Sequence, residues 1–268
     1  MRPITFLSDY GTADEFVGVV HAVIARQAPE ARVIDLAHGI PRHGVLQGAL
    51  TLARALPFAP RGVHLAVVDP GVGAARRAVA LQTADEERLL VGPDNGLLLP
   101  AAERFGGIAA AVEISASPWR LEPVSATFHG RDVFAPVAAR LAAGAPLAEA
   151  GTPLEPVERH ELDLPLPRRE QGALRATVIG IDTFGNVSLL ADHRDLEAAG
   201  LAIGRPVVVR AGADELTATY AHTFADVALG DALVFEDAAR MAAIAVNTGR
   251  AARRLDVRPG DELTLAAP

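Results

Sequence analysis

The chain has 268 residues, of which 50% are hydrophobic and 22% charged, and its formal net charge is −8. No cluster of positive charge stands out, so we expect neither a nucleic-acid partner nor an acidic-membrane partner. The absence of cysteine excludes disulfides, thiolate metal sites, iron–sulfur clusters and a cysteine nucleophile.

Apolar runs in the N-terminal part alternate with segments of helical spacing. Strands are expected over residues 4–7, 32–36, 63–68, 78–82, 89–91 and 109–114, and helices over residues 16–24, 45–56 and 131–143. Such alternation is typical of βαβ units. The sequence therefore predicts an α/β N-terminal domain, residues 1–150, with a mostly parallel sheet flanked by helices.

The composition changes after residue 150. Residues 151–172 combine several prolines with many charges and lose helical periodicity, which indicates a linker. Short strand-like runs then cover residues 174–181, 186–190, 206–210, 216–220, 232–235, 242–246 and 262–265. They predict a smaller all-β C-terminal domain, residues 173–268, built as an antiparallel barrel or sandwich.

Neither a targeting segment nor a membrane span is expected. The N-terminus contains an acid, Asp9, and lacks the apolar stretch that forms the core of a signal peptide. The alanine-rich stretches are interrupted too often to reach the roughly 20 apolar residues that a span needs. We therefore expect a cytoplasmic protein.

Two acids, Asp9 and Asp69, follow predicted strands. Ligands of open α/β sheets bind outside the carboxyl ends of the strands, so residues at these positions are candidates for a site. An aspartate taken alone is more often a turn or helix cap. Because the two acids end separate strands of one predicted sheet, we expect both at the same rim.

Other polar segments are less specific taken singly. Arg76 and Arg77 follow a glycine-rich turn that matches neither nucleotide-binding pattern, and they are equally consistent with a solvated pair. His129 precedes a predicted helix, whose N-terminus disfavours the imidazolium and leaves the ring able to accept a proton. A single histidine at such a place more often caps the helix or is hydrogen-bonded inside the loop. Residues 181–187 fit an ordinary hairpin as well as a site for an amino acid and a base.

Five motifs occur in order over nearly the whole chain: SDYG (8–11), VDPGVG (68–73), GPDNG (92–96), FHGRD (128–132) and IDTFGN (181–186). Together they closely resemble the S-adenosylmethionine (SAM) hydroxide adenosyltransferase family, which is related to the fluorinase and chlorinase. The resemblance implies an α/β N-terminal domain, a C-terminal β-barrel, and a homotrimer whose active sites lie between one subunit's N-terminal domain and its neighbour's C-terminal domain.

The resemblance also implies roles for particular residues. The family's catalytic triad falls on Asp69, Arg76 and His129, with Arg76 preferred to Arg77 by its distance from the aspartate. The substrate-binding residues implied are Asp9 for the ribose, Asp182 and Asn186 for the methionine and adenine ends, Phe184 and Phe224 as aromatic walls, and Asn247 in a pocket segment. No metal and no cofactor is implied.

The implied reaction is attack of water or hydroxide at C5′ of SAM, which yields adenosine and L-methionine; either Asp69 or His129 would be the base. The halogenating branch carries Tyr and Ser where this chain has Asp69 and Gly130, and a longer insertion that is absent between Gln82 and Gly92, so water is the expected nucleophile. Relatives usually carry Asn-Ser where this chain has Asp237-Ala238, which removes a contact to the methionine carboxylate.

Three alternatives remain at this point. One is halide-dependent transfer, as in the chlorinase, and another is a non-catalytic sensor that binds SAM or adenosine. The third is a metal-dependent hydrolase with His21, His38, His43, Asp9 and Asp69 as ligands. The third is disfavoured because H-E-x-x-H and comparable ligand spacings are missing from the sequence.

Overall fold

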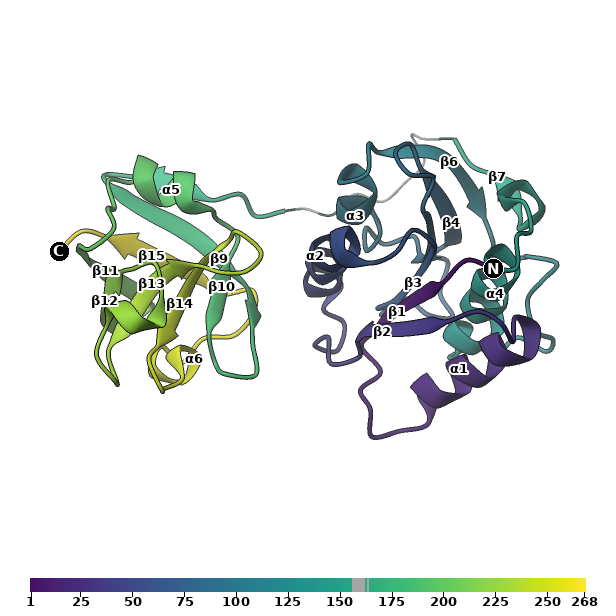
Figure 1. Ribbon diagram of the computed structural model, residues 1–268, viewed down its shortest axis with the longest axis horizontal. Helices are drawn as coiled ribbons and strands as arrows, with labels where there is room; N and C mark the ends of the chain where they lie inside the picture. Colours follow the sequence, from purple (N-terminus) through teal and green to yellow (C-terminus); the bar gives the residue numbers. More distant parts are fainter. Residues whose placement is uncertain (156–161, 163) are drawn as a thin grey trace. The chain divides into compact units, whose positions relative to one another are not determined.

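The computed structural model describes residues 1–155, 162 and 164–268, and divides into two compact units, Met1–Leu162 and Asp163–Pro268. The first unit combines a sheet with helices and the second is largely β (Figure 1). This confirms the predicted fold class. The predicted linker, residues 151–172, lies partly outside the described residues, and its described part contributes one short strand to each unit.

The sheet of the first unit has the strand order β2-β1-β3-β5-β4-β6-β7. Its strands are β1 (Ile4–Ser8), β2 (Val33–Ala37), β3 (Val63–Val67), β4 (Ala78–Thr83), β5 (Leu89–Pro93), β6 (Ile108–Glu113) and β7 (Thr152–Pro153). The pairs β1–β2, β1–β3 and β3–β5 are parallel, whereas β4–β5, β4–β6 and β6–β7 are antiparallel. The sheet is therefore mixed, and its parallel half ends in the loops that carry Asp9 and Asp69.

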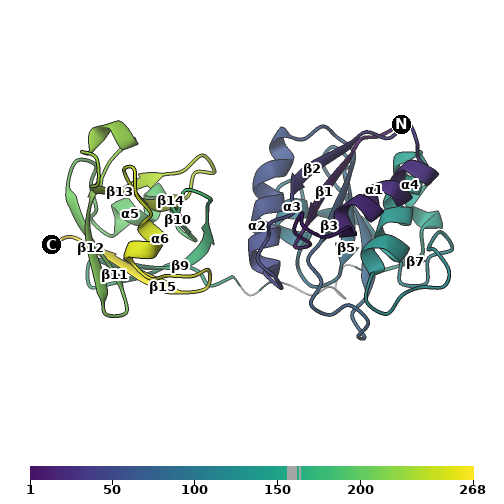
Figure 2. The same cartoon turned by 90° about the horizontal axis from the view of Figure 1, so that it is seen from below.

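Two pairs of helices cover the two faces of this sheet. Helices α1 (Phe16–Gln27) and α4 (Ala135–Ala142) lie on one face, and α2 (Val45–Ala55) and α3 (Leu99–Glu103) on the other (Figure 2). Residues of β3 alternate between the two cores: Leu65 packs with the α1 and α4 side, and Ala66 with the α2 and α3 side. This period of two explains why the strands read as continuous apolar runs in the sequence.

The second unit is a closed barrel of seven strands, because β10 pairs with both β14 and β9 at the ends of the order β10-β14-β13-β12-β11-β15-β9. The strands are β9 (Ala173–Ile181), β10 (Val187–Leu189), β11 (Pro206–Ala211), β12 (Asp214–Tyr220), β13 (Ala232–Glu236), β14 (Ala242–Val246) and β15 (Glu262–Ala266), and β8 (Arg168–Glu170) adds to β9. All pairs are antiparallel except β12–β13.

Short helices are the elements that the sequence did not predict. Helices α3, α5 (His193–Ala198) and α6 (Ala251–Arg254) are each shorter than two turns, so helical periodicity has no room to show. Helix α5 carries a detectable signal, because Asp192 and Asp195 form a reciprocal capping box at its start. Over the described part of the chain, every helix is too short or too polar to cross a membrane.

Candidate active site

The loops after β1 and β3 bring Asp9 and Asp69 to one edge of the parallel half-sheet. Ser8 is in register with Val67, and the Asp9 amide donates to the Val67 carbonyl oxygen over 3.3 Å. Parallel neighbours end at the same edge, so the residues that follow them are close in space although they are 60 positions apart. The expectation of a shared rim is therefore confirmed.

Asp69, Arg76 and His129 form one hydrogen-bonded chain. Arg76 Nε donates to Asp69 Oδ1 over 2.8 Å, and Arg76 Nη2 donates to Asp69 Oδ2. The same Nη2 lies 2.8 Å from His129 Nδ1. The Asp69 and Arg76 side chains are largely buried, with 6% and 10% of their surfaces exposed. Screening by water is therefore weak, and the bidentate contact holds the guanidinium plane in one orientation.

Gly73 allows the loop that carries Arg76 to approach the loop that carries His129. Its φ is +77°, and a β-carbon at this position would lie 2.4 Å from the Ala126 carbonyl oxygen. Only glycine combines the left-handed backbone with this close approach. The glycine-rich turn noted in the sequence therefore allows the close approach of the two loops that the chain of hydrogen bonds needs.

The environment of His129 favours its neutral form. His129 directly precedes a single π-helical turn, η2 (Gly130–Phe134), which runs into α4. Burial and the Arg76 cation lower the pKa of His129, and they outweigh Asp69 and Asp132, which raise it. Because a guanidinium has no acceptor, His129 Nδ1 must accept from Arg76, and the proton of the neutral ring therefore resides on Nε2.

Tyr10 is a residue of this site that the sequence analysis left without a role. Its ring packs near Phe16 and Phe128, with centroids 5.8 Å and 5.9 Å away. Burial raises the pKa of the Tyr10 hydroxyl, and the carboxylates of Asp9 and Asp69 raise it further, so the hydroxyl stays protonated. The aromatic residues at 10, 16 and 128 were visible in the sequence, but nothing local indicated that they meet.

The neighbouring motifs have supporting roles. Arg77 pairs with Asp94, with 2.9 Å between Arg77 Nε and Asp94 Oδ2, whereas Arg76 pairs with Asp69. The preference for Arg76 over Arg77 at the reacting centre stays a prediction. Asn95 Nδ2 donates to the Val68 carbonyl oxygen over 2.9 Å and so holds the backbone just before Asp69. The GPDNG turn therefore supports the backbone next to Asp69.

The remaining predicted binding residues lie in the barrel unit. Asp182 Oδ1 accepts from the amides of Phe184 and Asn186, and Asn186 Nδ2 donates to Asp182 Oδ2 over 2.7 Å. The Phe184 ring is 74% exposed at the tip of this turn. Asn247 Nδ2 donates to the carbonyl oxygens of Phe224 and Val227. The structure therefore assembles two pairs, Asp182 with Asn186 and Phe224 with Asn247.

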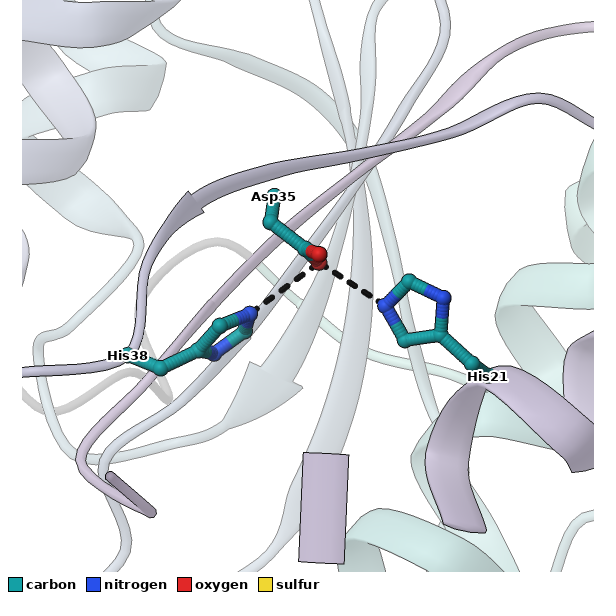
Figure 3. Close-up of side chains that lie close together, drawn as sticks. All are labelled: His21, Asp35 and His38. Carbon is teal, nitrogen blue, oxygen red and sulfur yellow. Dashed lines mark hydrogen bonds and ion pairs between the residues drawn. The ribbon is translucent and has the colours of Figure 1, made fainter. Parts of the chain in front are cut away.

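The suggested ligand set of a metal-dependent hydrolase does not assemble as a unit. Asp69 is paired with Arg76, and Asp9 Oδ2 accepts from the His43 amide over 3.1 Å. His21 and His38 do meet, at Asp35, a residue that the sequence analysis did not consider (Figure 3). Burial acts to raise the pKa of Asp35, but His38 and His21 outweigh it and hold the pKa below its usual value.

Most of the chain matches one protein family. Residues 4–151 match the N-terminal domain of SAM hydroxide adenosyltransferases, and residues 176–264 match their C-terminal domain. The chain belongs to the SAM hydroxide adenosyltransferase family. The resemblance drawn from the five sequence motifs is thereby confirmed.

Named proteins and a solved structure are similar to this chain over nearly its whole length. An (R)-S-adenosyl-L-methionine hydrolase from Salinispora tropica is 52% identical over 98% of this chain and 97% of its own length. A fluorinase from Actinoplanes sp. is 28% identical over 98% of this chain and 96% of its own. The crystal structure of an uncharacterized conserved protein from Thermotoga maritima matches with a TM-score of 0.89 and 39% identity, covering 98% of this chain and 99% of that one.

The lowered pKa of His129 gives a prediction about titration. The ring should titrate below the usual histidine value of ~6.5, and its midpoint should rise in Arg76→Gln, which removes the neighbouring cation. Because the unfolded chain binds this proton more readily, His129 should also cost stability as the pH falls below ~6.5. NMR of the histidine rings, assigned with His129→Gln, measures both midpoints. A wild-type midpoint at or above ~6.5 contradicts this account.

Packing at Gly130 gives a second prediction. A β-carbon at this position would lie 2.1 Å from the Tyr10 hydroxyl oxygen, so Gly130→Ala should displace Tyr10 and cost about 1–3 kcal/mol of stability. Gly18→Ala is the matched control: it meets no atom within 4 Å, and in helix α1 it should add up to ~1 kcal/mol. Urea unfolding measures both, and equal effects would show that Gly130 is not tightly packed.

Proposed function

We propose that this chain hydrolyses SAM to adenosine and L-methionine, with Asp69, Arg76 and His129 at the reacting centre. The observation that carries the proposal is the Arg76 guanidinium, which contacts Asp69 and His129 at once. Family membership and relatives named (R)-S-adenosyl-L-methionine hydrolase support it. We take the (R) sulfonium as the substrate, and no cofactor is needed because the sulfonium is already an activated leaving group.

The charges of the site suit a cationic substrate. An isolated arginine would repel the sulfonium, but Asp69 is bonded to Arg76 through both of its oxygens and neutralises it. The pair therefore offers a polar site with little net charge. As hydroxide and sulfonium charges cancel toward the transition state, a site of this kind with little water favours the reaction.

The hydrogen-bond directions support different roles for Asp69 and His129. His129 Nδ1 is occupied by the Arg76 donor, so the neutral ring presents Nε2–H, which can donate to a water oxygen but cannot take its proton. Asp69 keeps free lone pairs and accepts the proton as the water oxygen bonds to C5′. The C5′–sulfur bond breaks in line, methionine leaves as a neutral thioether, and the proton passes from Asp69 to solvent.

The binding residues complete the proposal. Asp9 would accept hydrogen bonds from the ribose diol through its carboxylate. Asp182 and Asn186 would hold the methionine and adenine ends, with Phe184, Phe224 and Asn247 around them. We propose that these barrel residues come from a neighbouring subunit of a homotrimer. The Phe184 ring is 74% exposed in the single chain, so it is available to contact a substrate or a neighbouring subunit. We also propose a cytoplasmic location.

The test is a product analysis with purified protein and SAM of defined configuration at sulfur. Adenosine and methionine should form, and mass spectrometry in ¹⁸O-water should place the label in the adenosine 5′-hydroxyl. Activity at saturating substrate should persist with a chelator. A 5′-halogenated product formed in the presence of chloride would instead assign the chain to the halogenating branch of the family. Binding without turnover would favour a sensor instead.

Arg76→Ala should lower kcat by roughly 10²–10³-fold and raise KM much less, because the guanidinium holds Asp69 and the Nε2–H tautomer of His129 in the arrangement that acts on the reacting water. Arg61→Ala is the control: it removes an exposed guanidinium that pairs with the exposed Glu87, so kcat should be retained. Steady-state kinetics on both variants decide the point. A change in KM alone would reject the role of Arg76.

Asp9→Ala should mainly weaken substrate binding, because a carboxylate accepts two hydrogen bonds and each bond to a charged group contributes ~1.5–3 kcal/mol. A rise in Kd of at least roughly tenfold is expected by calorimetry, with a smaller rise in Asp9→Asn. Asp214→Ala, which removes an exposed carboxylate from the β11–β12 hairpin, serves as the control. Unchanged affinity in Asp9→Ala would exclude the ribose role.

A further inference from the structure

Outside the Asp69–Arg76–His129 chain, the side chains of His21, Asp35 and His38 converge on one point (Figure 3). His21 lies on α1, Asp35 on β2, and His38 in the loop that follows β2. His21 Nε2 donates to Asp35 Oδ1 over 2.8 Å, and His38 Nε2 lies 3.0 Å from the same oxygen. Two imidazoles and one carboxylate from three separate segments therefore face one another.

The buried nitrogen of His38 lacks a satisfactory partner. Only 6% of its side chain is exposed, and its Nε2 makes no hydrogen bond of acceptable geometry. If Nε2 carries a proton, that proton therefore lacks a well-placed acceptor. If Nε2 carries a lone pair, the lone pair faces the Asp35 oxygen, which is also an acceptor, at 3.0 Å. Both arrangements leave a buried polar atom unfavourably placed, and a cation between the three donor atoms relieves both.

The dimensions of the group match a coordination site. A divalent transition metal lies about 2.0–2.2 Å from histidine nitrogen and carboxylate oxygen, so at the tetrahedral angle neighbouring donor atoms are roughly 3.3–3.6 Å apart. The three donor atoms lie within 4.8 Å of one another, and the two nitrogen–oxygen separations of 2.8 Å and 3.0 Å would widen by about 0.3–0.8 Å around an ion. His21 and Asp35 are 34% and 45% exposed, so they can adjust, and water can complete the coordination.

His38 also has the support that metal-binding histidines usually have. Its Nδ1 lies 2.8 Å from the hydroxyl oxygen of Ser8, which is fully buried and also accepts from the Tyr10 amide. With Nδ1–H donating to Ser8, the lone pair of Nε2 points at the group. Ser8 is therefore a positioning residue, and it fixes the ring from the side away from Asp35.

We propose that His21, Asp35 and His38 bind a divalent transition-metal ion of the Zn²⁺ class. Two imidazoles and a carboxylate suit such ions, whereas Mg²⁺ and Ca²⁺ prefer sets of oxygen ligands. The site is separate from the proposed hydrolysis and takes no part in its steps. It adds a metal where the sequence analysis expected none.

The bound ion would connect α1, β2 and the loop that follows β2. That loop contacts the segment that carries Asp9 and Tyr10. The His38 carbonyl oxygen accepts from the Gly11 amide over 2.7 Å, and the His38 ring contacts Ser8. Ser8 and Gly11 flank Asp9 and Tyr10. Metal binding therefore stabilises the segment that carries the proposed ribose ligand, and it should raise the thermal stability of the protein.

The experiment uses the full chain without a histidine tag, stripped by chelator and then titrated with Zn²⁺ in a calorimeter and with Co²⁺ by visible absorption. One ion per chain is expected, with Co²⁺ ligand-field bands and a Tm that rises with Zn²⁺ concentration. Mg²⁺ should not compete. Substoichiometric binding, or a Tm that does not respond to Zn²⁺, overturns the proposal.

Variants assign the ion to the three residues. His21→Gln and Asp35→Asn should weaken Zn²⁺ binding by more than ~100-fold, and Ser8→Ala by roughly 10–100-fold. The partly exposed His21 keeps the test valid if a change at buried His38 unfolds the chain. His193→Gln is the matched control, because His193 also contacts a carboxylate, Glu236 at 3.0 Å, but lacks a second imidazole. Equal affinity in wild type and His21→Gln overturns the assignment.

Discussion

The Arg76 guanidinium contacts Asp69 through two nitrogens and His129 through one of them, and it has donors but no acceptor. Its charge is cancelled by Asp69, so a sulfonium can lie nearby. Its donor occupies Nδ1 of His129, so the neutral ring turns an N–H outward. Its positive charge also keeps that ring neutral. The net charge of the site and the position of the proton on His129 therefore both depend on the Arg76 guanidinium.

The fold supplies the conditions for that contact. Parallel pairing of β1 with β3 brings the segments after them to one edge, and the asparagine of the GPDNG turn holds the end of β3. Gly73 then lets the loop of Arg76 approach the backbone that precedes His129. Each of these features is unremarkable alone. Together they join residues 53 positions apart in one hydrogen bond.

The residues of the proposed metal group come from α1, from β2 and from the loop that follows β2, next to the segment that carries Asp9. Ser8 connects the two sites, because its hydroxyl contacts the His38 ring and the Tyr10 amide, while the next residue is Asp9. We propose that one group of residues acts in the reaction and that the neighbouring group stabilises the structure. Asp69, Arg76 and His129 would act on the substrate, whereas His21, Asp35 and His38 would fix the segment on which the substrate rests.

The sequence by itself determined the fold classes, most strands and longer helices, and the family. These depend on local periodicity and on motifs that are read along the chain. It could not fix the antiparallel half of the first sheet or the helices shorter than two turns, because pairing partners and tertiary contacts decide them. It left the base open between Asp69 and His129, and it grouped His21 and His38 with the wrong acids.

Contacts in the tertiary structure show which groups meet, and the assignment of the base to Asp69 is proposed from them. Which nitrogen of His129 is occupied depends on Arg76, and which carboxylate meets His21 and His38 depends on the register of β2 against β1. The contacts of Arg76 with His129 and of His21 with Asp35 join residues from different elements, so spacing along one segment carries no information about them, whereas Asp35 and His38 are three residues apart. The motifs therefore named the residues of the reacting centre, while the hydrogen bonds between the loops assigned the roles that we propose for them.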